Sequence, residues 1–175
     1  MGASIRSIIQ QSYAPMLKAF DSILEKAADF AGAKQTDLAN ARLAPDMFTL
    51  AQQVQIATYF AREIPERLTT GDSIGELGDP PTSIDGMRQR VAEALEALGA
   101  ASDRLEEAGT VRCVIEPGGR DIAFEMNGEE YLLRWSLPNF YFHLVTAYGI
   151  LRKQGVEIGK IDYLASNVEF MRPRG

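Results

Sequence analysis

Apolar residues recur at steps of three and four along much of the chain, which is the spacing of amphipathic helices. The first such segment covers residues 4–32 and contains Pro15, which predicts a kink or a short preceding helix. The second begins near Pro45, with Asp46 as its expected N-cap. Pro65 is expected to end or bend it. The first half of the chain therefore predicts two helices joined by a polar loop.

The second half predicts two more helices of the same kind. A third amphipathic segment begins after its expected cap, Thr82 or Ser83, and runs to a glycine stop at Gly109. A fourth begins around Pro138, because proline is favoured in the first turn of a helix, and ends at Gly155. Four amphipathic helices of this length predict a four-helix bundle.

Between the third and fourth helices, at about residues 110–136, the hydrophobic period changes from helical to alternating. Turn signals at 117–119 and at Asn127-Gly128 divide this part into three short segments. We therefore expect a small antiparallel β insertion, with a three-stranded meander whose last strand contains Tyr131 and Trp135. The predicted fold class is mainly α: a single domain over residues 1–175, with a four-helix bundle and this insertion.

Composition narrows the class of protein without naming a function. Hydrophobic residues make up 46% and charged residues 24% of the chain, as in globular proteins. The formal net charge of −6 gives no overall attraction to nucleic acid. No apolar run approaches the length of a membrane span or a secretory signal. With a single cysteine, the chain is expected to be cytoplasmic, with neither nucleic acid nor a membrane as its partner.

The candidate chemistry centres on the only histidine, His143. Asn139 precedes it by four residues, so the two side chains share one face of the fourth helix. Gln53 and Asp46, on the second helix, could approach His143 if the two helices are neighbours. A neutral imidazole there could bind a metal, move a proton or make a buried hydrogen bond. Asp46 could instead only cap its helix, and Gln53 could only satisfy a buried polar group.

Two further residue types are candidates. Tyr148 is one of several tyrosines on the predicted helices that could line a ligand pocket, although aromatic residues at helical spacing more often form the core. Cys113 follows Arg112, which could lower the pKa of its thiol. The favoured interpretation of Cys113 is a small apolar strand residue.

Two stretches carry a resemblance to a known family. Residues 40–60 read NARLAPDMFTLAQQVQIATYF, and residues 137–164 read LPNFYFHLVTAYGILRKQGVEIGKIDYL. Together they resemble the domain-of-unknown-function-1993 family, a branch of the DinB/YfiT-like four-helix-bundle superfamily. The resemblance covers nearly the whole chain and agrees with the bundle predicted from periodicity.

The resemblance implies a site. DinB-like proteins commonly hold a divalent metal on three histidines, one from the second helix and two from a His-x-x-x-His pair on the last helix. Alignment of the last helix places His143 on the second histidine of that pair and Asn139 on the first. Gln53 lies near the position of the histidine on the second helix. The resemblance therefore implies a metal site that is altered or lost, and it also implies a homodimer.

Two functional hypotheses follow from these residues. In the first, the chain is an uncharacterised DinB-like bundle protein that binds a small molecule in a pocket near His143 and needs no cofactor. In the second, it is a divalent-metal-dependent, transferase-like enzyme that acts on small electrophiles with a thiol cosubstrate. His143 is then one of the metal ligands.

Overall fold

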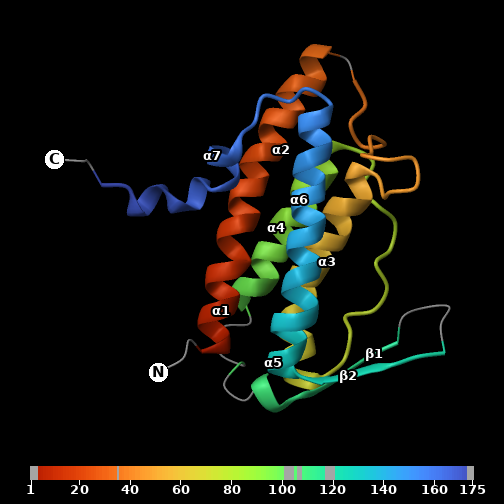
Figure 1. Cartoon of the computed structure of the whole chain (residues 1–175), viewed down its shortest axis with the longest axis vertical. Coiled ribbons are helices and arrows are strands. Elements are labelled where there is room, and N and C mark those ends of the chain that lie inside the picture. Colours follow the sequence, from red (N-terminus) through yellow and green to blue (C-terminus); the bar gives the residue numbers. More distant parts are fainter. Residues whose placement is uncertain (1–3, 35, 101–104, 106–107, 117–120, 173–175) are drawn as a thin grey trace.

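The chain folds into a bundle of long helices with a short β hairpin at one end (Figure 1). The computed structural model describes residues 4–34, 36–100, 105, 108–116 and 121–172. In the bundle, α3 packs along both α4 and α6, and α2 packs along α4. The predicted class, a mainly α bundle with a small antiparallel β insertion, is confirmed. The bundle helices are α1 (Ile5–Ser12), α2 (Ala14–Lys34), α3 (Leu50–Thr70), α4 (Ile84–Ala100) and α6 (Leu137–Lys153).

The expected break at Pro15 is present, because the first predicted helix consists of α1 and α2. Tyr13 joins the two and stays in the helical region, with its N–H bonded to the carbonyl of Ile9. The Tyr13 side chain is fully buried, and its hydroxyl shares a hydrogen bond of 2.7 Å with Ser136 Oγ. This contact ties the first helix pair to the start of α6.

The second predicted helix begins later and ends later than expected. The N-cap of α3 is Thr49, whose side chain accepts the Gln52 N–H while Gln52 bonds back to the Thr49 N–H. The prediction that Asp46 is the N-cap is wrong, because Asp46 lies exposed in the turn before α3. Nor does Pro65 end the helix, which continues to Thr70 because the residues beyond it, such as Leu68, are buried in the core.

The third predicted helix has its expected beginning. Ser83 Oγ accepts the N–H of Gly86 at 3.1 Å, as an N-cap does. The described part of α4 ends at Ala100. Most of the predicted extension toward Gly109 lies outside the described residues, and Gly109 itself sits in a short 3-10 turn, η1 (Ala108–Thr110).

The β insertion has two described strands, β1 (Arg112–Ile115) and β2 (Phe124–Asn127), which pair antiparallel. The predicted turn at 117–119 lies outside the described residues. The expected third strand is wrong, because the chain is helical there, in α5 (Gly128–Glu130) and a π-helical segment, η2 (Tyr131–Ser136), that runs into α6.

The reason for this difference lies in a capping box. Asn127 Oδ1 accepts the Glu130 N–H at 2.9 Å, and the Glu130 carboxylate accepts the Asn127 N–H at 3.0 Å. Asn127 therefore starts a helix instead of turning a hairpin. In a strand, Tyr131 and Leu133 would lie on the same face. Tyr131 is buried whereas Leu133 is exposed, so the alternation of apolar residues here does not mark the buried face of a strand.

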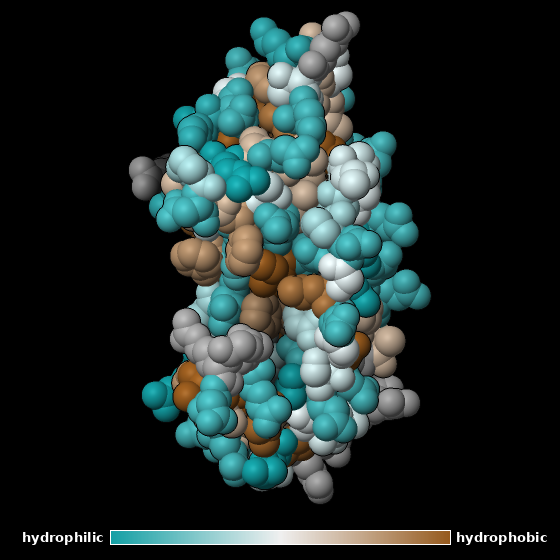
Figure 2. All heavy atoms as spheres, turned by 90° about the vertical axis from the view of Figure 1, so that its right-hand side faces the viewer, coloured by the Kyte–Doolittle hydropathy of each residue, from teal (hydrophilic) through white to brown (hydrophobic). Residues whose placement is uncertain are grey.

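Past α6 the chain leaves the bundle. The short helices α7 (Lys160–Tyr163) and η3 (Ala165–Phe170) lead to a C-terminal end that points away from the other helices (Figure 1). Apolar side chains are also exposed near the middle of one long face of the molecule (Figure 2). Among the helices formed by the described residues, none combines the length and the hydropathy needed to span a bilayer.

Candidate functional site

The structure brings His143 and Gln53 into direct contact where α6 packs on α3. His143 Nδ1 and Gln53 Oε1 are 2.7 Å apart. Both side chains are buried: 8% of His143 and 1% of Gln53 is exposed. The two helices are neighbours, which is the condition under which Gln53 could approach His143.

The hydrogen bonds of Gln53 indicate which tautomer His143 adopts. The Gln53 amide nitrogen donates to the Phe48 carbonyl at 3.4 Å, which leaves the amide oxygen facing the imidazole. An amide oxygen only accepts, so His143 donates its Nδ1–H to it. Burial lowers the pKa of His143 from 6.5 to about 4, so the ring is neutral at pH 7. A neutral ring with a proton on Nδ1 carries its lone pair on Nε2.

The Nε2 atom of His143 has no hydrogen-bond partner among the described residues. Every buried side-chain nitrogen and oxygen in the described part of the chain has a hydrogen-bond partner, and no hydrogen bond to Nε2 is found there. It follows that Nε2 is in contact with solvent. Phe142 meets the imidazole edge-to-face with ring centroids 5.2 Å apart, and Phe48 lies at 6.5 Å. These two phenylalanines are about half exposed, so an acceptor nitrogen lies beside apolar surface.

In the described part of the chain, no hydrogen bond joins the other predicted site residues to this pair. Asn139, which shares a helix face with His143, donates its side-chain N–H to the carbonyl of Trp135, four residues back in η2, at 2.7 Å. Asp46 is exposed in the turn before α3. Tyr148 packs against Tyr163, with ring centroids 6.1 Å apart. Cys113 is buried, and that burial raises the pKa of its thiol, as expected for an apolar strand residue and not for a nucleophile.

A second polar cluster, near the other end of α3, has no counterpart among the sequence predictions. Arg67 Nη2 lies 2.6 Å from Glu63 Oε1, and the Tyr131 hydroxyl donates to Glu63 Oε2 at 2.5 Å. All three residues are buried. Burial, and then the Glu63 carboxylate, raise the pKa of the Tyr131 hydroxyl far above its ordinary value. Glu63 and Arg67 are four residues apart and adjoin Ile64 and Leu68 of the apolar stripe, which is the signal that could have revealed them.

The donor groups around His143 do not fit the three-histidine metal site that the resemblance implies. The Gln53 oxygen is engaged by the Nδ1–H of His143, and the Asn139 amide points its nitrogen at a backbone carbonyl. The described residues contain no group of three His, Cys, Asp or Glu side chains placed to hold a metal ion. His143 therefore supplies one imidazole ligand without the companions that a tight divalent site needs.

The helical arrangement and its hairpin define a bundle of DinB-like fold. A crystal structure of a DinB family member from Shewanella denitrificans has a TM-score of 0.73 and 37% sequence identity, and covers 89% of this chain and 88% of its own. The family described as domain of unknown function DUF1993 matches residues 7–164. The chain belongs to this DUF1993 family. No curated protein matches it significantly.

The buried histidine predicts a pH dependence of stability. The pKa of His143 is about 4 in the folded chain, against an ordinary value of 6.5, so between these values the unfolded chain binds more protons. The contribution of neutral His143 to the free energy of unfolding is therefore fully present above pH 6.5, and it is lost as the pH falls toward 4. We expect a loss of roughly 2–3 kcal/mol from this residue.

Urea unfolding of the wild type and of His143→Gln from pH 7 to pH 4 measures this contribution. Both proteins have the same carboxylates. The difference between their slopes of unfolding free energy against pH therefore isolates the contribution of His143. Parallel curves would show that the pKa of His143 is not lowered by folding.

Proposed function

We propose that this chain is a small-molecule-binding protein in which the superfamily metal position is altered and the Gln53–His143 pair forms the polar centre of the binding site. The observation that carries the proposal is the hydrogen bond between His143 Nδ1 and Gln53 Oε1, which fixes the ring and leaves Nε2 as an acceptor. A few placed polar groups beside apolar surface are the usual make-up of a ligand site. Phe48 and Phe142 supply that apolar surface.

This geometry suits a ligand with one hydrogen-bond donor on an apolar body. The donor would bond to His143 Nε2, and the body would pack against the two phenylalanine rings. The metal-dependent transferase is the weaker candidate, because a metal-bound thiolate requires a metal site and the donor groups around His143 do not form one.

Phenol and anisole form a matched pair of probes, because they differ in the hydroxyl proton. Titration with phenol is expected to shift the ring signals of His143 saturably in NMR spectra, whereas anisole is expected to bind more weakly. Phe142→Ala should weaken phenol binding, and Val168→Ala, at an apolar position in the C-terminal segment, serves as the control. Equal shifts with both probes, or none with either, would refute a binding role for Nε2.

A metal titration addresses the alternative function. Zn²⁺ added to the purified protein is expected to bind His143 no more tightly than a single exposed imidazole does. If the protein instead carried near-stoichiometric metal that His143→Ala removed, the transferase hypothesis would replace the present one.

We further propose that the protein is a homodimer, as the family resemblance implies. Apolar side chains exposed on α6 and in the C-terminal helices α7 and η3 support this, among them Val145, Ile161 and Phe170. Light scattering at micromolar concentration should give twice the chain mass of 19.3 kDa, and a monomer would contradict the proposal. The cytoplasmic location and the lack of nucleic-acid partners stay predictions from composition.

A further inference from the structure

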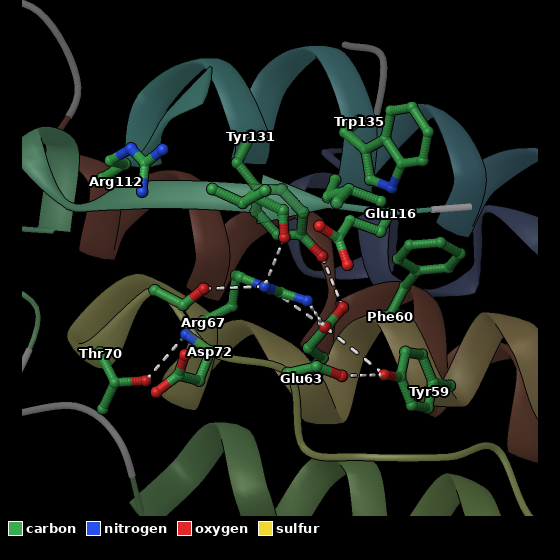
Figure 3. A pocket seen from close by; sticks show the side chains of 14 residues that line it. Tyr59, Phe60, Glu63, Arg67, Thr70, Asp72, Arg112, Glu116, Tyr131 and Trp135 are labelled. Carbon is green, nitrogen blue, oxygen red and sulfur yellow. Dashed lines mark hydrogen bonds and ion pairs between the residues drawn. The ribbon is translucent and has the colours of Figure 1, made fainter. Parts of the chain in front are cut away.

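A cavity of about 830 Å³ lies between the C-terminal half of α3, the strand β1 and the segment η2 (Figure 3). It is remote from the Gln53–His143 pair. Glu63, at its base, follows Gln53 by ten residues, which is about 15 Å along a helix axis. The volume is in the range of cavities that hold small organic ligands, roughly 300–1,000 Å³.

Aromatic side chains form part of the wall of this cavity. Tyr59, Phe60, Tyr131 and Trp135 all line it. Phe124 supports Trp135 from the hairpin side, with ring centroids 5.1 Å apart. The Tyr59 hydroxyl is held by Ser73 Oγ at 2.6 Å and by the Gly75 carbonyl at 2.9 Å. Tyr59 and Trp135 are therefore held in place by neighbouring residues, and these two rings and that of Phe60 are partly exposed, whereas Tyr131 is buried.

The cationic groups of the cavity are already neutralised. Arg67 is bound to Glu63 and also donates to the carbonyls of Gly71 and Val114. Arg112 forms a bidentate ion pair with Glu125, in which both N–O distances are 2.7 Å. An anionic ligand would find no free positive charge on either arginine.

Two further carboxylates, those of Asp72 and Glu116, belong to the same cavity. Asp72 and Glu116 line it, and within the described residues neither carboxylate has an ion-pair partner. In Figure 3 the Glu116 carboxylate lies in the cavity, on the side of Trp135 and Phe60. The cavity thus combines excess negative charge with the electron-rich faces of aromatic rings.

We propose that this cavity binds an organic ammonium ion, with the cationic head beside Glu116 and against the rings of Trp135 and Phe60, while Asp72 adds negative charge on the other side of the cavity (Figure 3). Aromatic faces attract cations that approach within about 6 Å of the ring centre, and indole does so most strongly. Carboxylates add a Coulomb attraction that no arginine of the cavity cancels. A quaternary ammonium ion has no N–H to donate to His143 Nε2, so a ligand of that kind distinguishes this cavity from the Gln53–His143 site.

Trp135 is the only tryptophan of the chain, so its fluorescence reports directly on this cavity. The probes are benzyltrimethylammonium, neutral benzyl alcohol and anionic benzoate, which have similar apolar bodies and different charges. We expect saturable quenching by the ammonium ion, with binding at least about tenfold tighter than that of the other two probes. Isothermal titration calorimetry should rank the affinities of the three probes in the same order.

Variants locate the binding and separate it from the His143 site. Glu116→Gln combined with Asp72→Asn should weaken binding of the ammonium ion about tenfold, and both positions are exposed, so the fold is retained. Glu66→Gln, at an exposed carboxylate of α3 outside the cavity, should leave binding unchanged, as should His143→Ala. Equal binding of all three probes, or full affinity in the double variant, would overturn the proposal.

Discussion

Replacement of Arg67 by methionine is expected to lower the free energy of unfolding by about 3–5 kcal/mol. The Arg67 and Glu63 side chains are 8% and 3% exposed, so loss of the guanidinium leaves a carboxylate buried without its counterion. Although burial opposes the charged form, the Glu63 carboxylate raises the pKa of Arg67, in keeping with a tight pair. Arg67 also stacks over the Tyr131 ring at 5.5 Å. Urea unfolding measures the effect.

A matched control is available one turn away on the same helix. Arg62 lies 3.8 Å from Glu93 in a partly exposed pair, and Arg62→Met should change stability by less than about 1 kcal/mol. Combining Glu63→Gln with Arg67→Met should cost much less than the sum of the two single changes, because the double variant buries no unpaired charge. Additive losses would show that the two side chains do not act as a pair.

Gly128→Ala is the second change expected to be severe. A Cβ atom at this position would lie 1.8 Å from the backbone oxygen of Ala108, an overlap that no side-chain movement can relieve. The backbone of η1 or of α5 would have to shift, at a cost of about 3 kcal/mol or more. Since α5 leads through η2 into α6, the damage would spread to the hairpin and to Tyr131. Thermal unfolding should show a lower Tm.

Gly99→Ala provides the opposite expectation. Gly99 lies near the end of α4, and a Cβ there would have nothing within 4 Å. Alanine at a helical, uncrowded position should stabilise the protein by up to about 1 kcal/mol. If Gly128→Ala were as harmless as Gly99→Ala, the close approach of α5 to η1 would be contradicted.

The bundle was predictable because its signals are periodic and local. Apolar steps of three and four marked each long helix, Pro15 marked the junction of α1 and α2, and Ser83 marked the start of α4. The errors arose where two local signals compete. Asp46 and Thr49 are both good N-caps, and only Thr49 has a glutamine placed to complete the capping box. Asn127-Gly128 is a hairpin-turn signal as well as a helix start.

The candidate sites were predictable to different extents. Gln53 was a candidate because it borders the apolar stripe and because the resemblance places it near the expected histidine of the second helix. The hydrogen bond of Asn139 to its own helix could not be read from its spacing to His143, since an amide can bond along the helix as well as across it. The Glu63–Arg67–Tyr131 cluster depends on a contact between residues 68 positions apart, which helical periodicity does not encode.

The state of His143 is the central claim, and it can be measured without ambiguity because the chain has one histidine. In ¹⁵N-labelled protein, two-bond correlations between the ring nitrogens and carbon-bound protons distinguish the tautomers. We expect a neutral ring with its proton on Nδ1 at pH 7, and a pKa of about 4 when the ring is titrated. A proton on Nε2, or a pKa near the ordinary value of 6.5, would contradict the proposed acceptor site.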